Sequence, residues 1–325
     1  MQLAKTDQSI NFSYSQSWIG NLPIAFSTSL SFAHAKANTP VNAFTPNLEL
    51  NQNNYTMAYH DYSATLSSGL ARRWTPDYAI ISLAGGISTS LKINQFDETN
   101  NVPVDTSVAL YANRLGISNS LYASFAVDNR DNNYDPTKGW YLNERLSWYG
   151  LIPGLEKEFY ARSDTKLEGY FKLFDIPFTE KWSLKLILAG YTGLSAIIPA
   201  GSGISEKNSI YLDGMLNGRG WQDAYKNTTG LAMLSNKLEL RIPIVPGIVG
   251  IDGFWDAAVV KPTLNEIIQI KPEDWYFSFG PGIRVLLPQI PLHLMFAWRY
   301  RIVDGQPKFA DQPYNFVLSF NVVNN

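Results

Sequence analysis

The residues that could perform catalysis are few and lie far apart in the sequence. The histidines are His34, His60 and His293, and the chain contains no cysteine. Neither a G-x-S-x-G nucleophile motif nor an H-E-x-x-H metal motif occurs. The glycine pairs at 201–203 and 280–282 lack the context of a phosphate-binding loop. We therefore expect no catalytic residue, no metal site and no cofactor, and we expect His293 to make a structural polar contact.

An arginine between two glycines is the other candidate for chemistry, because a partly dehydrated guanidinium needs carboxylate partners. This motif reads Gly218, Arg219, Gly220, Trp221, and it lies in residues 196–230, the longest predicted loop. The two segments that follow carry Glu239, Phe254 and Asp256. Alternation along a strand places these three side chains on the polar face. The polar face of these two segments therefore holds two carboxylates and an aromatic ring.

The composition argues against a nucleic-acid-binding protein and against a helical membrane protein. The 325 residues include 26 Lys and Arg and 28 Asp and Glu, a net charge of -2, without a concentrated basic face. No window offers the ~18 consecutive apolar residues of a transmembrane helix. Charged residues make up 17% of the chain, fewer than the roughly 25% of a soluble domain.

Strands that alternate between polar and apolar residues must position the candidate residues. In residues 159–173 every charged side chain has one parity, and the opposite parity carries none. Such a run can cross a bilayer as a tilted strand, which takes ~9–11 residues. A soluble β-sandwich or a lipocalin-like barrel would also alternate. Charges of both signs opposite long, aromatic-ended apolar faces favour a membrane barrel instead.

The connections between the predicted strands alternate in length, as in an outer-membrane barrel with short periplasmic turns. Short connections are predicted at 18–23, 74–78, 135–139, 176–181, 243–250 and 287–291. Long ones are predicted at 36–58, 94–115, 196–230, 262–274 and 303–313. The pattern gives about 13–14 strands, and an odd count does not suit a complete bacterial barrel. Either two strands are merged in this count, or the chain begins part-way through its barrel.

Four segments, in order, resemble the barrel of the BamA superfamily, which comprises outer-membrane assembly factors and two-partner secretion proteins. The first is a strand-turn-strand motif formed by Asp128, Arg130, Asp131, Pro136 and Gly139. The second is the Gly218–Trp221 motif, where the family has V/I-R-G-F/Y. The third joins Asn236-x-x-Glu239-x-Arg241-x-Pro243 to Phe254-Trp-Asp256. The fourth is Ser278-x-Gly280-x-Gly282, followed by a closing strand with Phe316, Leu318, Phe320 and Val322.

The resemblance implies an all-β, antiparallel transmembrane barrel of the 16-stranded type. On that register the first three strands and the periplasmic POTRA domains are absent, and residues 1–325 form a single barrel domain. The loop at 196–230 is expected to fold inward and to dock Arg219 on Asp256, Glu239 or both, beside Phe254. The expected location is the bacterial outer membrane, which the chain crosses many times.

The function that the resemblance implies is the folding and insertion of other barrel proteins, without nucleotide. Substrate strands would pair with an exposed edge at a weak seam beside the closing strand. The implied partners are the lipid bilayer, nascent outer-membrane proteins and accessory lipoproteins, with no nucleic acid and no enzymatic activity. Two alternatives remain: a translocator that serves one exported protein, and a passive porin or adhesin.

Overall fold

A computed structural model of the protein describes residues 2–3, 7–44, 50–96, 101–103, 106–109, 111–152, 156, 158–179, 182–200, 204, 208–224, 228–287 and 290–319. Most of these residues lie in one antiparallel sheet in which each long strand pairs with the next. The long strands are β2 (Asp7–Gln16), β3 (Ile24–Phe44), β4 (Leu50–Trp74), β5 (Ile80–Phe96), β7 (Gly116–Asp128), β8 (Gly139–Tyr149), β9 (Tyr160–Thr179), β10 (Trp182–Pro199), β13 (Ala232–Val245), β14 (Val249–Lys261), β15 (Tyr276–Leu287), β16 (Ile290–Val303) and β17 (Gln306–Ser319).

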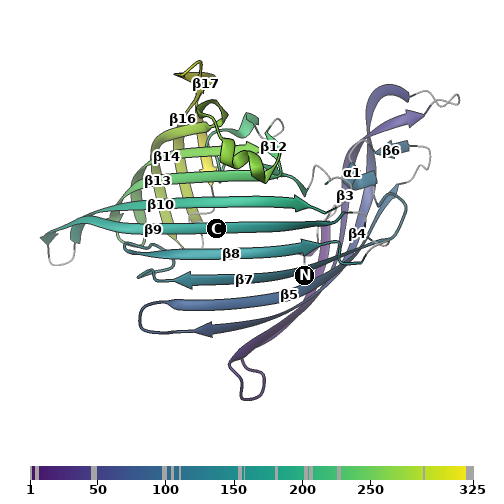
Figure 1. Ribbon diagram of the computed structural model, residues 1–325, viewed down its shortest axis with the longest axis horizontal. Coiled ribbons are helices and arrows are strands. Elements are labelled where there is room, and N and C mark those ends of the chain that lie inside the picture. The colour runs from purple at the N-terminus through teal and green to yellow at the C-terminus, as the bar shows by residue number, and fades with distance from the viewer. Residues whose placement is uncertain are drawn as a thin grey trace.

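The sheet bends into a deep trough (Figure 1). In that view β8, β9 and β10 cross the middle, β13 to β17 rise on one side, and β3 and β4 stand on the other. The short β1 (Gln2–Leu3) pairs with β2, and β6 (Asn101–Pro103) pairs with β3. Within the described ranges, no pairing joins β17 to β2. The long strands number thirteen there, in agreement with the predicted 13–14.

The two faces of the sheet differ in polarity, as the alternation predicts. In β9 the side chain of Glu168 is 1% exposed, whereas its neighbour Leu167 is 47% exposed. In β16, His293 and Arg299 are buried inside the trough, while Phe296 is exposed outside. A transmembrane barrel requires this arrangement, because the lipid face excludes charge and a filled or watery lumen tolerates it.

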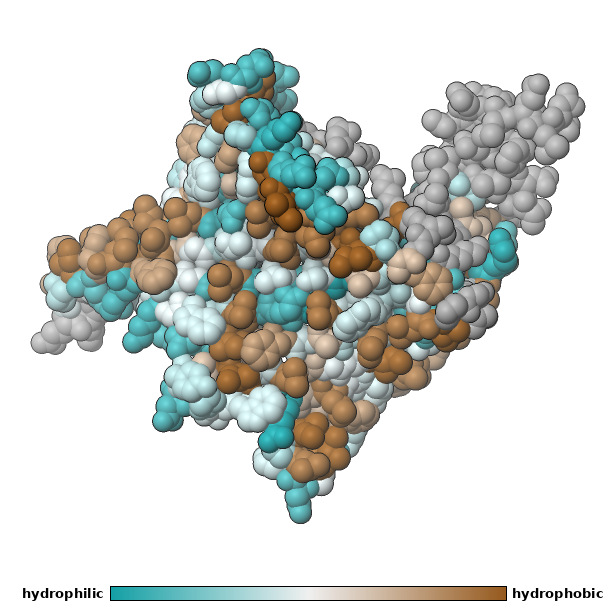
Figure 2. All heavy atoms as spheres, in the orientation of Figure 1, coloured by the Kyte–Doolittle hydropathy of each residue, from teal (hydrophilic) through white to brown (hydrophobic). Residues whose placement is uncertain are grey.

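A bulge keeps the apolar face continuous where β9 and β10 extend beyond their neighbours. The pairing skips Leu173: Ile187 pairs with Lys172, and Leu186 pairs with Phe174. The extra residue shifts the alternation by one, so that Asp175 and its partner Lys185 point away from the lipid face. The projecting part of these strands, residues 171–179 of β9 and 182–186 of β10, lies at the left of Figure 2, brown along one side and teal along the other.

Two of the predicted long loops are wrong. Residues 36–58 belong largely to β3 and β4, whose pairing extends to Phe44 and Leu50, because polar strands can continue into water beyond a bilayer. Residues 303–313 are mostly strand. Asp304 and Gly305 have φ values of 52° and 73° and form a two-residue hairpin connection, which an Asp-Gly pair favours.

The remaining long connections carry short elements. The connection at 94–115 includes β6 and α1 (Thr106–Ala109), and β5 continues to Phe96. The connection at 262–274 contains the 3-10 helices η3 (Leu264–Gln269) and η4 (Pro272–Asp274). The described segments contain no helix long and apolar enough to cross a membrane.

The loop with the glycine–arginine motif begins later than predicted. Residues 196–199 belong to β10, where Ala196 pairs with Ala232 of β13, so the connection runs from 200 to 231 instead of 196 to 230. Inside it, β11 (Ile210–Tyr211) pairs with β12 (Thr229–Gly230), and η2 (Gln222–Ala224) follows the motif. The loop therefore has its own two-stranded stem.

Candidate functional site

The loop segment 212–224 folds tightly on itself before it reaches the barrel wall. The side chain of Asp213 accepts hydrogen bonds from the backbone amides of Met215 and Leu216 at 2.6 and 3.1 Å. Its backbone carbonyl accepts from the amide of Gly218 at 2.9 Å. Leu212, Trp221 and Ala224 then bury against Ala258 of β14. This packing fixes the direction in which Arg219 leaves the loop.

Arg219 makes a two-pronged contact with Asp256. Its Nε lies 2.6 Å from Asp256 Oδ2, and its Nη2 lies 2.5 Å from Asp256 Oδ1. Its Nη1 lies 2.5 Å from Glu239 Oε1, on the neighbouring strand β13. The arginine is 4% exposed and Asp256 is fully buried. The structure therefore places Arg219 in contact with both predicted partners, Asp256 and Glu239.

Apolar atoms and a second arginine complete this site. The guanidinium carbon of Arg219 lies 4.1 Å from the centre of the Phe254 ring, and Nη1 lies 3.6 Å from the Met295 sulfur. The second oxygen of Glu239 is 2.8 Å from Arg241 Nε. Two carboxylates therefore face two arginines in a dehydrated space. Removal of one partner from such a buried group costs about 3–5 kcal/mol.

Both glycines of the motif are required by space or by backbone conformation. A Cβ at Gly218 would lie 2.7 Å from Leu212 Cδ1. Gly220 has a φ of +92°, which side chains with a Cβ rarely adopt, and a Cβ there would lie 2.7 Å from Ala297 Cβ. The loop backbone therefore lies directly against the wall at β16.

The motif also contacts the strands beside the C-terminal edge of the sheet. Trp221 Nε1 donates to the backbone carbonyl of Phe277 in β15 at 3.0 Å. The Arg299 guanidinium of β16 lies 5.1 Å from the Trp221 ring. Asn315 Nδ2 of β17 donates to the Gly220 carbonyl at 2.7 Å. The tetrapeptide Gly218–Trp221 therefore contacts every long strand from β13 to β17, the last described strand.

Sequence reasoning missed four wall residues, namely Met295, Ala297, Arg299 and Asn315. All four have inward parity on strands that it placed correctly, so the orientation of their side chains was readable. Their contact with the loop could not be predicted from the sequence, because no sequence rule fixes how far a loop extends into a lumen.

The strand-turn-strand motif builds a second ion cluster in the lumen, next to the first: the Tyr170 ring lies 5.3 Å from the Arg241 guanidinium carbon, and its hydroxyl donates to Glu168 at 2.9 Å. Arg130 Nε and Nη2 lie 2.9 and 2.8 Å from the two oxygens of Asp128. Its Nη1 lies 2.9 Å from Glu168 of β9, and its guanidinium carbon lies 4.4 Å from the Tyr141 ring. Arg130 therefore ties the end of β7 to β8 and β9.

Asp131 organises the turn itself. Its carboxylate accepts hydrogen bonds from the Thr137 amide and hydroxyl, at 2.9 and 2.6 Å, and from the Lys138 amide at 3.2 Å. Partial burial opposes ionisation, but these hydrogen bonds outweigh it and lower the pKa of Asp131. The turn is therefore held most firmly above the ordinary Asp pKa, and this support is lost as the pH falls through the lowered value. Pro136 is buried, and Gly139 adopts a φ of +102°.

The same turn reaches the far wall of the lumen. Tyr134 donates from its hydroxyl to the Leu286 carbonyl of β15 at 2.7 Å. Asp135 lies 3.3 Å from Arg284 Nη1, and Arg284 Nε lies 3.0 Å from Asp252 of β14. His293 Nε2 lies 3.1 Å from Asp252, the kind of structural polar contact expected of this histidine. The sequence pattern gave no signal for this crossing.

The closing strand is described only in part. Phe316 and Leu318 of β17 point outward, 51% and 36% exposed, while Val317 between them is fully buried. Phe320 and Val322 lie outside the described residues. Among the side chains that the structure describes, no group of three or more His, Cys, Asp or Glu residues could hold a metal ion.

An antiparallel sheet with a lipid face, a polar inner face and an inward-docked loop defines an outer-membrane barrel whose lumen is partly filled. The chain belongs to the Omp85 superfamily, whose domain model matches residues 1–321. It is 36% identical over 297 residues to a putative outer membrane protein assembly factor of Treponema pallidum (strain Nichols). That match covers 83% of this chain and 35% of the relative, so the chain spans about a third of the relative's length.

Two solved structures share the fold. BamA from Haemophilus ducreyi lacking POTRA domains 1–3 matches with a TM-score of 0.57 and 16% identity, over 97% of this chain and 62% of the other. CdiB from Acinetobacter baumannii matches with a TM-score of 0.53 and 11% identity, over 96% and 50%. The predicted resemblance to the BamA superfamily and the predicted all-β transmembrane barrel fold are confirmed.

Proposed function

We propose that this chain is the transmembrane part of an assembly factor that folds and inserts barrel proteins into the bacterial outer membrane. The relative named as a putative outer membrane protein assembly factor supports this function over its alternatives. We further propose that residues 1–325 act as one barrel domain that crosses the membrane many times. The reaction would be strand pairing and insertion, which makes and breaks no covalent bond and uses no nucleotide.

The observation that carries the proposal is the double attachment of the Gly218–Trp221 motif. Arg219 is held by Asp256 and Glu239, while the Gly220 carbonyl accepts from Asn315 of β17. The loop is thereby hydrogen-bonded to β17, the last described strand of the sheet. A porin requires a water-filled channel, and a loop anchored in the lumen by buried ion pairs occupies that space, so this attachment argues against a passive porin.

In the described part of the chain β17 pairs with β16 alone, and we propose that its other side supplies the chemistry that assembly requires. An edge strand presents unpaired backbone N–H and C=O groups, which an incoming strand can satisfy. We propose nascent barrel proteins as the substrates, with the surrounding bilayer as the acceptor and accessory lipoproteins as further partners. The docked loop would hold β15 to β17 in position while the edge exchanges partners. No nucleic acid takes part.

Depletion of the full-length protein from its host tests the proposal directly. Quantification of the outer-membrane fraction should show a general fall in many unrelated barrel proteins. Rescue with Arg219→Ala should fail, whereas Lys92→Ala should restore the barrels, because Lys92 of β5 forms its ion pair with Asp61 of β4, away from the loop. Loss of a single exported protein would instead establish a dedicated translocator. Unchanged barrel levels would overturn the assembly function.

A further inference from the structure

Two histidines lie together on the lipid side of the sheet. His34 Nε2 of β3 lies 2.8 Å from His60 Nδ1 of β4, and the rings stack with centres 5.1 Å apart. His34 also stacks on Tyr62 at 4.6 Å. Lys36 pairs directly opposite His60, on the same face. Sequence reasoning treated the histidines as scattered, since it could not know the register of β3 on β4.

The depth of this group places it at the membrane surface. β3 starts at Ile24, close to the short turn at 18–23, and His34 lies ten residues further along the strand. At ~3.3 Å per residue this is roughly 33 Å of strand. With a tilt of about 40°, it equals about 25 Å along the membrane normal, the height of the apolar belt. His34 and His60 therefore lie at the headgroup level of the outer leaflet.

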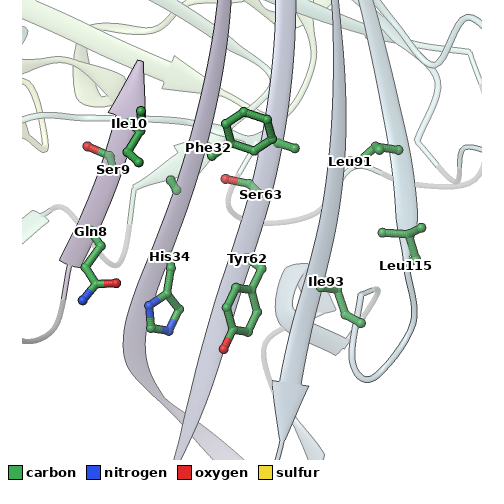
Figure 3. Close-up of a pocket in the computed structure, with 12 residues that line it drawn as sticks. Gln8, Ser9, Ile10, Phe32, His34, Tyr62, Ser63, Leu91, Ile93 and Leu115 are labelled. Carbon is green, nitrogen blue, oxygen red and sulfur yellow. The ribbon is translucent and has the colours of Figure 1, made fainter. Parts of the chain in front are cut away.

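A hollow of about 450 Å³ begins beside His34, the partner of His60, and follows the apolar belt inward. Figure 3 shows Ile10, Phe32 and Leu91 in one row across the strands, and Gln8, His34, Tyr62 and Ile93 in the next. Ala64 pairs opposite both Phe32 and Leu91, and its short side chain leaves the space open. The apolar side chains of Phe32, Tyr62 and Leu91 are 46%, 39% and 41% exposed around it. The hollow therefore has a polar end beside Gln8, His34 and Tyr62 and an apolar part beside Ile10, Phe32 and Leu91 (Figure 3).

We propose that this hollow seats one anionic phospholipid, with an acyl chain beside Phe32 and Leu91 and the phosphate at His34, His60 and Lys36. The hollow is continuous with the lipid face, so a lipid is its natural occupant. Two neutral imidazoles joined by one hydrogen bond keep one N–H and one bare nitrogen for other partners. That N–H can donate to a phosphate oxygen, and the Lys36 ammonium beside the pair is a second donor.

The charges around the hollow favour an anion. Lys36 is exposed on this face, directly beside the imidazole pair. Asp61 lies next to His60 in sequence but points to the inner face, where it pairs with Lys92 at 3.1 Å. In the two rows that hold His34 and His60, the described residues of β2 to β5 place no carboxylate on the lipid side. The seat is independent of the proposed assembly function.

Native mass spectrometry of the detergent-purified full-length protein tests the seat. Dioleoylphosphatidylglycerol should be retained in preference to dioleoylphosphatidylcholine, and the His34→Ala/His60→Ala variant should lose this preference by about tenfold, the value of one or two charge-assisted hydrogen bonds. Ala64→Phe should fill the hollow and release both lipids, with Ala64→Leu as a milder filler. Arg72→Ala removes a lipid-face cation beside Trp74, at the other end of the belt, and should change neither retention.

Heat-modifiable gel mobility shows that each variant is folded before its lipids are compared. Unchanged retention in the histidine variant would overturn the proposal, as would an equal loss in Arg72→Ala. A third outcome would also overturn the proposal: inorganic phosphate displaces the lipid, and the Ala64 variants retain the lipid normally. The histidines would then bind phosphate, but no acyl chain would occupy the hollow.

Discussion

The carboxylate of Asp135, in the turn between β7 and β8, lies 3.3 Å from the guanidinium of Arg284 in β15. Four strands separate β8 from β15 in the sheet order, namely β9, β10, β13 and β14. The contact therefore crosses the lumen and does not run along one wall. Together with the bond from Tyr134 to Leu286, it makes a short turn into a brace between opposite sides of the barrel.

Changes at the two ends of this brace should differ in cost. Asp135→Asn leaves Arg284 paired with Asp252, so it should lower the unfolding free energy by about 1–3 kcal/mol. Arg284→Met leaves the buried Asp135 without its cation and Asp252 with His293 alone, and it should cost about 3–5 kcal/mol. The midpoint of urea unfolding, followed by gel mobility, should fall further for Arg284→Met. Equal midpoints, or the reverse order, would show that the brace does not work through this ion pair.

Arg219 and Asp256 should behave as one buried unit. Arg219→Met leaves the fully buried Asp256 without its cation, and this should cost about 3–5 kcal/mol. The double variant Arg219→Met/Asp256→Leu should recover most of that loss, because Glu239 keeps Arg241 at 2.8 Å. Protease cleavage within residues 200–231 should report undocking in the single variant and protection in the double one. A double variant as labile as the single one would contradict the pairwise account.

The sequence predicted this ion pair because the family resemblance implies that the loop folds inward, and two physical constraints then select its partners. Alternation fixes the face to which Glu239 and Asp256 point, and a buried guanidinium has few tolerable partners other than carboxylates. Alternation also fixes the inward direction of Asn315, but its amide contacts the loop through a backbone carbonyl that any residue could offer. Backbone contacts of this kind leave no trace in residue types.

Gly220 should tolerate no side chain, for two separable reasons. Gly220→Ala places a Cβ at a φ of +92° and 2.7 Å from Ala297, so it should undock the loop. Gly305→Ala is a matched control, since its φ is +73° and its surroundings are open, and it should show only the conformational cost of about 1 kcal/mol. Adding Ala297→Gly to Gly220→Ala should remove the clash with Ala297 Cβ but leave the conformational cost of the positive φ. Proteolysis of the loop and the unfolding midpoint together distinguish the two contributions.

The strand count was predictable and the strand ends were not. Alternation persists wherever a strand faces lipid on one side, which is why thirteen long strands could be located. At residues 36–58 the strands leave the apolar belt, and the polar residues there are as compatible with a ribbon as with a loop. The Asp304–Gly305 connection could have been read from its residues, because both positions adopt a positive φ and Asp-Gly favours that turn.

The bulge at Leu173 leads to a deletion experiment whose result depends only on register. Leu173 is the unpaired residue of β9, so its removal should give a regular ladder in which Phe174 and Asp175 keep their faces. Removal of Leu167, in the regular part of the strand, should instead shift the residues on one side of the gap to the opposite face. Glu168 or its ion partners would then meet lipid, which a transmembrane strand does not tolerate. The Leu173 deletion should reach the outer membrane and show heat-modifiable mobility, and the Leu167 deletion should do neither. If both deletions folded equally well, β9 could slip in register, and alternation would not be what holds this strand in place.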